Sequence, residues 1–221
     1  MYNYEYVTRE QSQPVKNNLI EIINEVQILV KSDFTFRFDF VGSSSRNMIT
    51  CDFSQNIGFD FDVNIEVNDR NDVFSAKGIK EKLMGAFNKI INKNTNYNID
   101  FFNYYSNCEN STRVFTIKVK DQQNSRIIHS ADFCIVNHYE VDGEEFEEYI
   151  RYIKKNDVYV WNRQSDGFKN LDERIDLIKS NNRWNDVRVL YLEKKNYNVD
   201  KDKKSRSLFA EAVKEVCDRL N

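Results

Sequence analysis

The stretch Phe59-Asp-Phe-Asp-Val-Asn-Ile-Glu-Val67 decides the fold predicted for this chain. Apolar residues occupy every second position, which is the period of a β-strand with one buried face. Asp60 and Asp62 therefore share the polar face, with backbones about 6–7 Å apart. Like charges on one face repel, but two carboxylates so placed can share a divalent ion such as magnesium. An ordinary solvent-facing strand edge is the alternative.

A second strand is predicted just upstream, at 34–41, where phenylalanine alternates with polar residues. It ends at Gly42-Ser43-Ser44-Ser45-Arg46, and a short helical segment is predicted over residues 44–49. Glycine permits close approach of the backbone, and N–H groups and hydroxyls at a helix start favour phosphate. Arg46 is either a bidentate phosphate ligand or the ion-pair partner of Asp52 or another acid. A plain turn is the alternative for the Gly-Ser pair.

A third carboxylate, Asp132, lies inside the apolar strand predicted at 127–136. Burying a charge is costly unless it is paired or bound to a metal. Asp132 is therefore a candidate metal ligand, and a salt bridge to a nearby lysine or arginine is the alternative.

Other segments complete the predicted order of elements. A helix is predicted at 15–31, with Ser12 as its cap and Pro14 in its first turn, and a second helix at 78–92. The acidic stretch 142–148 is predicted to be a solvated loop. The remaining predictions are strands at 97–105 and 113–120, a hairpin of 149–153 with 158–161, and helices at 171–181, 183–195 and 205–220.

Length and composition exclude several classes of protein. The 221 residues are 40% hydrophobic and 14% aromatic, which is typical of a folded globular protein. A net charge of −3 argues against general electrostatic binding of nucleic acid. No apolar run approaches a membrane span, and residues 1–10 lack the pattern of a secretory signal. We therefore expect no membrane association and a cytoplasmic location. The four cysteines are expected to be reduced thiols, and the compositional bias suggests an AT-rich bacterial genome.

Taken together, the three motifs resemble the polymerase β-type nucleotidyltransferase superfamily. Its signature is a strand ending in Gly-Ser, Asp-hydrophobic-Asp on the next strand, and an acidic residue on a later strand. Here these parts are Gly42-Ser43, Asp60-Phe61-Asp62 and Asp132. The resemblance covers residues 15–137. The N-terminal helix and the helical tail are similar to those of the oligoadenylate synthase-like and cyclic-dinucleotide-synthase-like branch.

This resemblance implies an α+β fold: a mixed sheet with flanking helices, followed by a C-terminal helical region. The predicted division is a nucleotidyltransferase core at 1–167 and a helical region at 168–221 that packs on the core and forms one wall of a cleft. Sixteen residues separate Ser43 from Asp60, more than is usual in the superfamily. Residues 51–58 are therefore predicted to be an inserted loop over the site.

The chemistry implied by the resemblance is transfer of a nucleoside monophosphate from a nucleoside triphosphate, such as ATP, to a hydroxyl. Magnesium or manganese would be held by Asp60, Asp62 and Asp132, and Asp132 would serve the acceptor side. Gly42, Ser43, Ser44 and Arg46 would bind the nucleotide phosphates. The acceptor stays open among RNA, a second nucleotide, a protein side chain and a small molecule.

Two other functions remain open at this stage. The chain could bind nucleotide on the same fold without transfer, as a regulatory module, or be a structural or toxin–antitoxin partner that depends on a second chain. Several further residues have a structural interpretation that is favoured over a functional one. They are Glu66, His129, His138, Tyr104, Tyr105, Trp161 and the basic residues Lys179, Arg183, Arg188, Lys194 and Lys195.

Overall fold

The computed structural model describes residues 2–69, 73–93, 103–121, 123, 126–164, 170–200 and 202–220, without the side chains of residues 103 and 104. The chain divides into two compact units. One unit comprises Val7–Ile49 and Ile57–Gln164, and the other comprises Met1–Tyr6, Thr50–Asn56 and Ser165–Asn221. We call the first the sheet unit and the second the helical unit.

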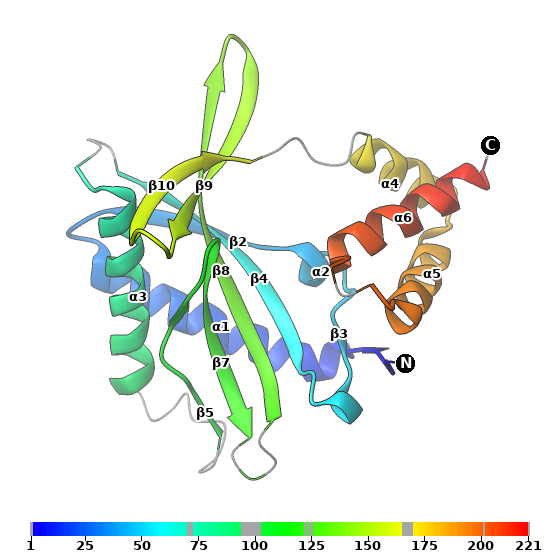
Figure 1. The fold of residues 1–221 in the computed structure, drawn as a ribbon, viewed down its shortest axis with the longest axis horizontal. Helices are drawn as coiled ribbons and strands as arrows, with labels where there is room; N and C mark the ends of the chain where they lie inside the picture. Colours follow the sequence, from blue (N-terminus) through cyan, green and yellow to red (C-terminus); the bar gives the residue numbers. More distant parts are fainter. Residues whose placement is uncertain are drawn as a thin grey trace. The chain divides into compact units, whose positions relative to one another are not determined.

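Both units are drawn in Figure 1, where most of their elements are labelled. The described helices are α1 (Arg9–Val30), α2 (Gly42–Ser45), α3 (Ala76–Lys93), α4 (Leu171–Ser180), α5 (Trp184–Tyr197), α6 (Ser205–Asp218) and the 3-10 helix η1 (Phe53–Gln55). The described strands are β1 (Glu5–Tyr6), β2 (Thr35–Val41), β3 (Thr50–Cys51), β4 (Phe59–Asn68), β5 (Asn103–Tyr105), β6 (Glu109–Asn110), β7 (Val114–Asp121), β8 (Arg126–Val141), β9 (Glu144–Ile153) and β10 (Val158–Arg163).

The sheet unit is built on one mixed sheet. Its strands follow the order β10-β9-β8-β4-β2, and β7 also pairs with β8. β4 and β8 are parallel, whereas the other neighbours are antiparallel. The predicted α+β fold is therefore confirmed, and the strands predicted at 36–41, 59–67 and 127–136 lie side by side.

The core of this unit lies on the apolar face of the sheet. Phe61, Val63 and Ile65 of β4 are at most 1% exposed. Phe87 of α3 packs on this face, with its ring centroid 4.5 Å from that of Phe133. α1 packs against α3, and the Lys16 amine of α1 lies 4.6 Å from the ring centre of Phe40. The two helices predicted at 15–31 and 78–92 therefore cover one face, as expected from their apolar stripes.

The first helix begins earlier than predicted. Thr8 rather than Ser12 is its cap: the Thr8 hydroxyl accepts from the Gln11 backbone N–H, and the Gln11 side chain accepts from the Thr8 N–H. This reciprocal capping box satisfies two N–H groups that a helix start leaves unpaired. Pro14 consequently lies inside the helix rather than in its first turn.

The acidic stretch 142–148 is not the solvated loop that the composition predicts. It forms the tip of a hairpin, in which β8 continues to Val141 and β9 begins at Glu144. Asp142 and Gly143 form a two-residue turn with positive φ values of 54° and 82°. Asp-Gly is the favoured sequence for such a turn, because both positions require φ above zero. The prediction gave more weight to charge than to this turn signal.

The other strand predictions are confirmed where the structure describes them. β7 matches the strand predicted at 113–120, and β9 pairs with β10 as the predicted second hairpin. Of the strand predicted at 97–105, residues 97–102 lie outside the described part, and β5 covers the rest.

The helical unit contains the three C-terminal helices at nearly the predicted positions. α6 packs on both α4 and α5, around buried residues such as Ile178, Val187 and Val213. β1 pairs with β3, so residues 51–58, predicted to be an inserted loop, contain part of a short strand and the turn η1. The packing of 168–221 on the core and its role as a cleft wall stay predictions.

Two further findings concern the chain as a whole. Cys51, Cys108, Cys134 and Cys217 are free thiols, in agreement with the expectation from composition. Among the residues that the structure describes, no helix is both long and apolar enough to cross a bilayer.

Candidate functional site

The register of β4 on β8 brings the three predicted carboxylates to one face of the sheet. Asp62 is paired with Asp132, and Asp60 is paired with Ser130. Paired residues of neighbouring strands point to the same face, and their strands lie about 4.8 Å apart. Phe61 and Ala131, the residues between these positions, point the other way and are buried in the core. We call the polar side the carboxylate face.

Hydroxyl groups on the neighbouring positions hold two of these carboxylates. The Ser130 hydroxyl donates to Asp60 Oδ1 at 2.5 Å, and the Thr116 hydroxyl donates to Asp132 Oδ1 at 2.5 Å. Thr116 belongs to β7 and is paired with Asp132. These bonds fix the orientation of carboxylates that would otherwise turn away from one another.

The three carboxylates disturb one another electrostatically. Asp60 retains exposed surface, but loss of hydration, repulsion from Asp132 and a smaller repulsion from Asp62 raise its pKa to about 7, against the hydrogen bond from Ser130. Loss of hydration and repulsion from Asp132 also raise the pKa of Asp62. The pKa of Asp132 is raised by loss of hydration, and the Thr116 hydrogen bond opposes this. In the absence of a cation the arrangement therefore opposes full ionisation.

Three basic residues act on the same carboxylates. Lys118 of β7, which pairs with Glu109, lowers the pKa of Asp60 and of Asp132. Arg46 and Arg113 each lower the pKa of Asp62. The sequence interpretation included Arg46 but missed Lys118 and Arg113. The alternation of Thr116 and Lys118 on a strand next to Asp132 was the signal that could have identified Lys118.

The Gly42 turn lies against the carboxylate face. Val41 pairs with Asp62, so the turn begins beside that carboxylate. Gly42 has a φ of +66°, and a Cβ built there would collide with Asp62 Oδ2 and lie 3.1 Å from its Cγ. Only glycine fits both the left-handed backbone and the narrow space. The structure thus explains why glycine occupies this position.

The predicted phosphate ligands of the turn differ in their surroundings. The Ser44 hydroxyl donates to the Val41 carbonyl at 2.8 Å, and Ser44 is buried. Its hydroxyl hydrogen is therefore already used within the turn. Ser43 is half-buried, and its carbonyl accepts from the backbone N–H groups of Arg46 and Met48. The roles of all four residues as phosphate ligands stay predictions.

The residue set of the carboxylate face fits a divalent cation in part. Carboxylate oxygens are the ligands that Mg²⁺ prefers, and Mg²⁺ usually takes one or two of them together with substrate phosphates. No group of three or more His, Cys, Asp or Glu side chains within the described ranges is arranged to enclose a metal ion. The mutual repulsion of Asp60, Asp62 and Asp132 favours separation until a cation lies between them. Their convergence on shared ions stays a prediction.

The residues for which a structural role was favoured have structural partners. His129 is buried, stacks on Phe59 and contacts the hydroxyl of Tyr105, itself buried. The Glu66 carboxylate pairs with Arg37 and accepts from His138. Trp161 lies half-buried in β10, whereas the side chain of Tyr104 lies outside the described residues. These contacts give His129 and Glu66 structural partners.

The basic residues of the C-terminal helices also have partners within the helical unit. Ion pairs join Arg183 to Asp186 and Lys194 to Glu215. The other three lie over aromatic rings, in the pairs Lys179–Trp184, Arg188–Tyr6 and Lys195–Tyr4. These contacts support the structural interpretation of the five residues over a dedicated phosphate site.

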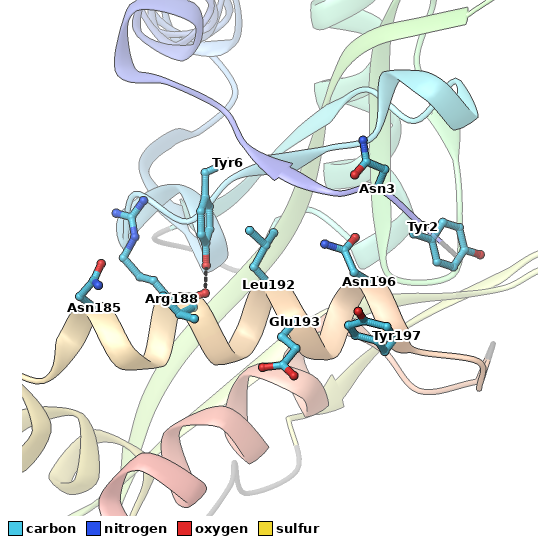
Figure 2. A pocket seen from close by; sticks show the side chains of 10 residues that line it. Tyr2, Asn3, Tyr6, Asn185, Arg188, Leu192, Glu193, Asn196 and Tyr197 are labelled. Carbon is cyan, nitrogen blue, oxygen red and sulfur yellow. Dashed lines mark hydrogen bonds between the residues drawn. The ribbon is translucent and has the colours of Figure 1, made fainter.

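A pocket of about 520 Å³ lies in the helical unit between the N-terminal segment and α5 (Figure 2). The Tyr6 hydroxyl donates to the Arg188 carbonyl at 2.7 Å along one side of it. The residues lining it are Tyr2, Asn3, Tyr6, Asn185, Arg188, Val189, Leu192, Glu193, Asn196 and Tyr197. None of the predicted site residues is among them.

Comparisons with known proteins identify the fold. No family model and no curated protein sequence matches the chain. Solved structures do match. The Vibrio cholerae DncV cyclic AMP-GMP synthase, a prokaryotic cGAS homolog, aligns over 95% of this chain and 68% of its own, with 13% identity and a TM-score of 0.60.

Two further structures are similar. DncV in complex with GTP and 5MTHFGLU2 aligns over 96% of this chain at 13% identity, with a TM-score of 0.55, and this chain spans 55% of its length. The Elizabethkingia meningoseptica CdnE cyclic dinucleotide synthase with GTP and Apcpp aligns over 90% of this chain and 67% of its own, at 15% identity and a TM-score of 0.49. At such identities the likeness concerns the fold alone, and the chain has the polymerase β-type nucleotidyltransferase fold in common with the DncV structures.

Proposed function

We propose that this protein is a metal-dependent nucleotidyltransferase that moves a nucleoside monophosphate from a nucleoside triphosphate to a hydroxyl acceptor. The proposal is supported by the fold it shares with cyclic dinucleotide synthases. The observation that carries it is the in-register pairing of Asp62 with Asp132, with Asp60 on the same face. Loss of hydration and repulsion from Asp132 raise the pKa of both Asp60 and Asp62, so this arrangement costs stability in the absence of a cation. Sites that keep such a cost are typically functional.

The residues have distinct roles in this proposal. Asp60 and Asp62 would hold the ion that binds the triphosphate, and Asp132 would help hold an ion on the acceptor side. When bound, magnesium or manganese would neutralise phosphate charge and lower the pKa of the acceptor hydroxyl. Thr116 and Ser130 keep the carboxylates oriented through the hydrogen bonds they donate.

The Gly42 turn would receive the phosphates of the nucleotide. Its close approach to Asp62 would place the phosphate chain beside a cation held by that carboxylate. Arg46 is half-buried, and its charge already acts on Asp62. A guanidinium can hold a phosphate through two parallel hydrogen bonds. Arg46 would therefore exchange its interaction with Asp62 for one with phosphate as the cation binds.

The test is a transfer assay with α-labelled ATP, GTP, CTP and UTP, each with Mg²⁺ or Mn²⁺, in which pyrophosphate and labelled products are followed. We expect pyrophosphate release by the wild type and its loss in Asp62→Asn. Asp39→Asn is the matched control, because Asp39 is an exposed aspartate on the neighbouring strand, opposite Asn64. It should retain wild-type activity.

Two results would contradict the proposal. If the wild type binds a triphosphate but releases no pyrophosphate with any acceptor tried, the chain is a binding module on this fold. If the wild type binds no triphosphate in the presence of either Mg²⁺ or Mn²⁺, the proposal of a nucleotide-dependent function is wrong. ATP as the preferred substrate and a cytoplasmic location stay predictions.

A further inference from the structure

The edge of β8 has a junction at which one neighbouring strand replaces another. β7 pairs with β8 from Arg126 to Cys134, and β9 pairs with it from Val136 to Val141 on the same edge. The two strands therefore meet end to end beside Ile135. This junction lies two to four residues beyond Asp132 along β8.

The tight turn that precedes β7 is fixed at this junction. The Ser111 backbone N–H and hydroxyl both donate to the Val114 carbonyl at 3.0 Å. The Tyr152 N–H of β9 donates to the Thr112 carbonyl at 2.7 Å. The Lys80 amine of α3 donates to the Ser111 carbonyl at 3.0 Å. Its own internal bonds and hydrogen bonds from two separate elements, β9 and α3, thus hold a turn of only four residues.

The burial of Lys80 at this turn costs stability. It is 1% exposed, and burial lowers its pKa to about 8. Lysine is almost never fully buried without a partner, because removing an ammonium group from water is costly. Holding the turn in place is the visible use of this side chain.

The turn presents Arg113 to solvent. Its guanidinium carbon lies 4.4 Å from the ring centre of Tyr149, and its side chain also bonds to the Cys134 thiol. An aromatic face and a thiol orient a guanidinium but do not neutralise its charge. The same charge lowers the pKa of Asp62. Arg113 is thus an exposed, oriented cation beside the carboxylate face.

The order of the strands gives this cation a position relative to Arg46. Across the sheet the order is β2 with the Gly42 turn, β4 with Asp62, β8 with Asp132, and then the junction with Arg113. Arg46 and Arg113 therefore lie on opposite sides of the carboxylates. A residue that only filled the junction would be apolar and buried, whereas Arg113 is exposed.

We propose that Arg113 binds a phosphate group on the Asp132 side of the carboxylate face, opposite the phosphates held by the Gly42 turn. This inference rests on the proposed function. The fixed turn and the ring of Tyr149 hold the guanidinium before the ligand arrives, so that little rotational freedom is lost on binding. Phosphate is the group that its planar, two-pronged geometry fits.

The test compares ATP binding with Mg²⁺ by calorimetry in Arg113→Gln, Arg113→Lys and the control Arg151→Gln, with melting temperatures measured in parallel. Arg151 is also an exposed arginine, two residues beyond Tyr149 on the same strand. We expect Arg113→Gln to weaken binding about 10- to 100-fold, as loss of a charge-assisted hydrogen bond does. Arg113→Lys should recover part of the loss, and Arg151→Gln should bind as the wild type does.

The location of the phosphate is tested by combining Arg113→Gln with Arg46→Gln. If the two arginines hold different phosphates, the losses of the single variants should multiply in the double variant. A double variant no weaker than the worse single variant would refute the two-sided arrangement.

Other outcomes would overturn the proposal about Arg113. One is an Arg113→Gln protein that binds ATP as Arg151→Gln does. Another is a large fall in melting temperature for Arg113→Gln together with wild-type binding by Arg113→Lys, which would assign the side chain to the junction. Failure of the wild type to bind ATP would instead refute the proposed function.

Discussion

Replacing Gly42 with alanine tests how the turn and Asp62 fit together. Gly42 has a φ of +66°, and an added Cβ would collide with Asp62 Oδ2. The new methyl group cannot move away, because it is fixed to the backbone of the turn. The Asp62 side chain must therefore rotate or shift.

The expected magnitudes for stability and activity differ. An alanine in the left-handed region costs about 1–2 kcal/mol, which lowers the melting temperature by roughly 2–8 °C for a chain of this length. Moving a catalytic carboxylate by about 1 Å can reduce the rate by on the order of 100-fold. We therefore expect a folded protein with a large loss of transfer.

Gly143→Ala is the matched control. Gly143 also has a positive φ, +82°, but an added Cβ there meets no atom within 4 Å. Gly143→Ala introduces the same backbone strain in the β8–β9 turn, but the new methyl group does not touch the carboxylate face. Both variants should melt at lower temperature than the wild type. We expect Mg²⁺ to raise the melting temperature of the wild type, because it would bind the native carboxylates and relieve their repulsion. Only Gly42→Ala should lose this rise and pyrophosphate release.

One result would refute this reasoning. If Gly42→Ala keeps wild-type transfer and the Mg²⁺-dependent rise in melting temperature, the turn does not constrain Asp62. An equal loss of activity in both variants would also contradict it, because backbone strain alone would then explain the effect.

Three more predictions follow from the environments of single residues. Because the pKa of Asp60 is raised to about 7, the native metal-free protein holds a proton that the unfolded chain releases above about pH 4. The melting temperature of the metal-free wild type should therefore fall as the pH rises from about 4 to about 7, and more steeply than that of Asp60→Asn. At pH 8, Mg²⁺ should restore the melting temperature of the wild type. Burial lowers the pKa of Lys80 to about 8. As the pH rises from 8 to 10, the wild type should therefore gain stability relative to Lys80→Met. Equal pH profiles of the two proteins would contradict the burial of a charge at this position. Phe61→Ala should lower the free energy of unfolding, measured by chemical denaturation, by about 3–5 kcal/mol, because the Phe61 ring is 1% exposed. A loss no larger than that of a surface substitution would place Phe61 outside the core.

The fold was predictable because its signals are local and repeated. The alternation in Phe59–Val67 predicted β4, and helical stripes predicted α3 and the C-terminal end of α1 to within two residues. The misplaced start of α1 has a local cause too, since the capping box at Thr8 lies upstream of the apolar stripe. The hairpin at 142–148 was missed because the acidic composition was given more weight than the Asp-Gly turn.

The candidate site was predictable only in part. Asp60 and Asp62 share a face by the period of a strand alone, and Asp132 was found as a charge in an apolar strand. Thr116, Ser130 and Arg113 carry no such signal, because threonine, serine and arginine are ordinary residues near the ends and edges of strands. Their importance arises from which residues lie opposite them.

The sequence by itself thus determined that 59–67 and 127–136 form strands and that Asp60 and Asp62 share the polar face of theirs. Only the tertiary structure decided that Asp62 pairs with Asp132, that Thr116 and Ser130 orient the carboxylates, and that Arg113 stands beside them. The physical reason is the distance along the sequence over which each feature is set. The alternation of a strand is set by neighbouring residues, whereas register depends on hydrogen bonds between segments some 70 positions apart, and a shift of one residue would turn Asp132 to the other face.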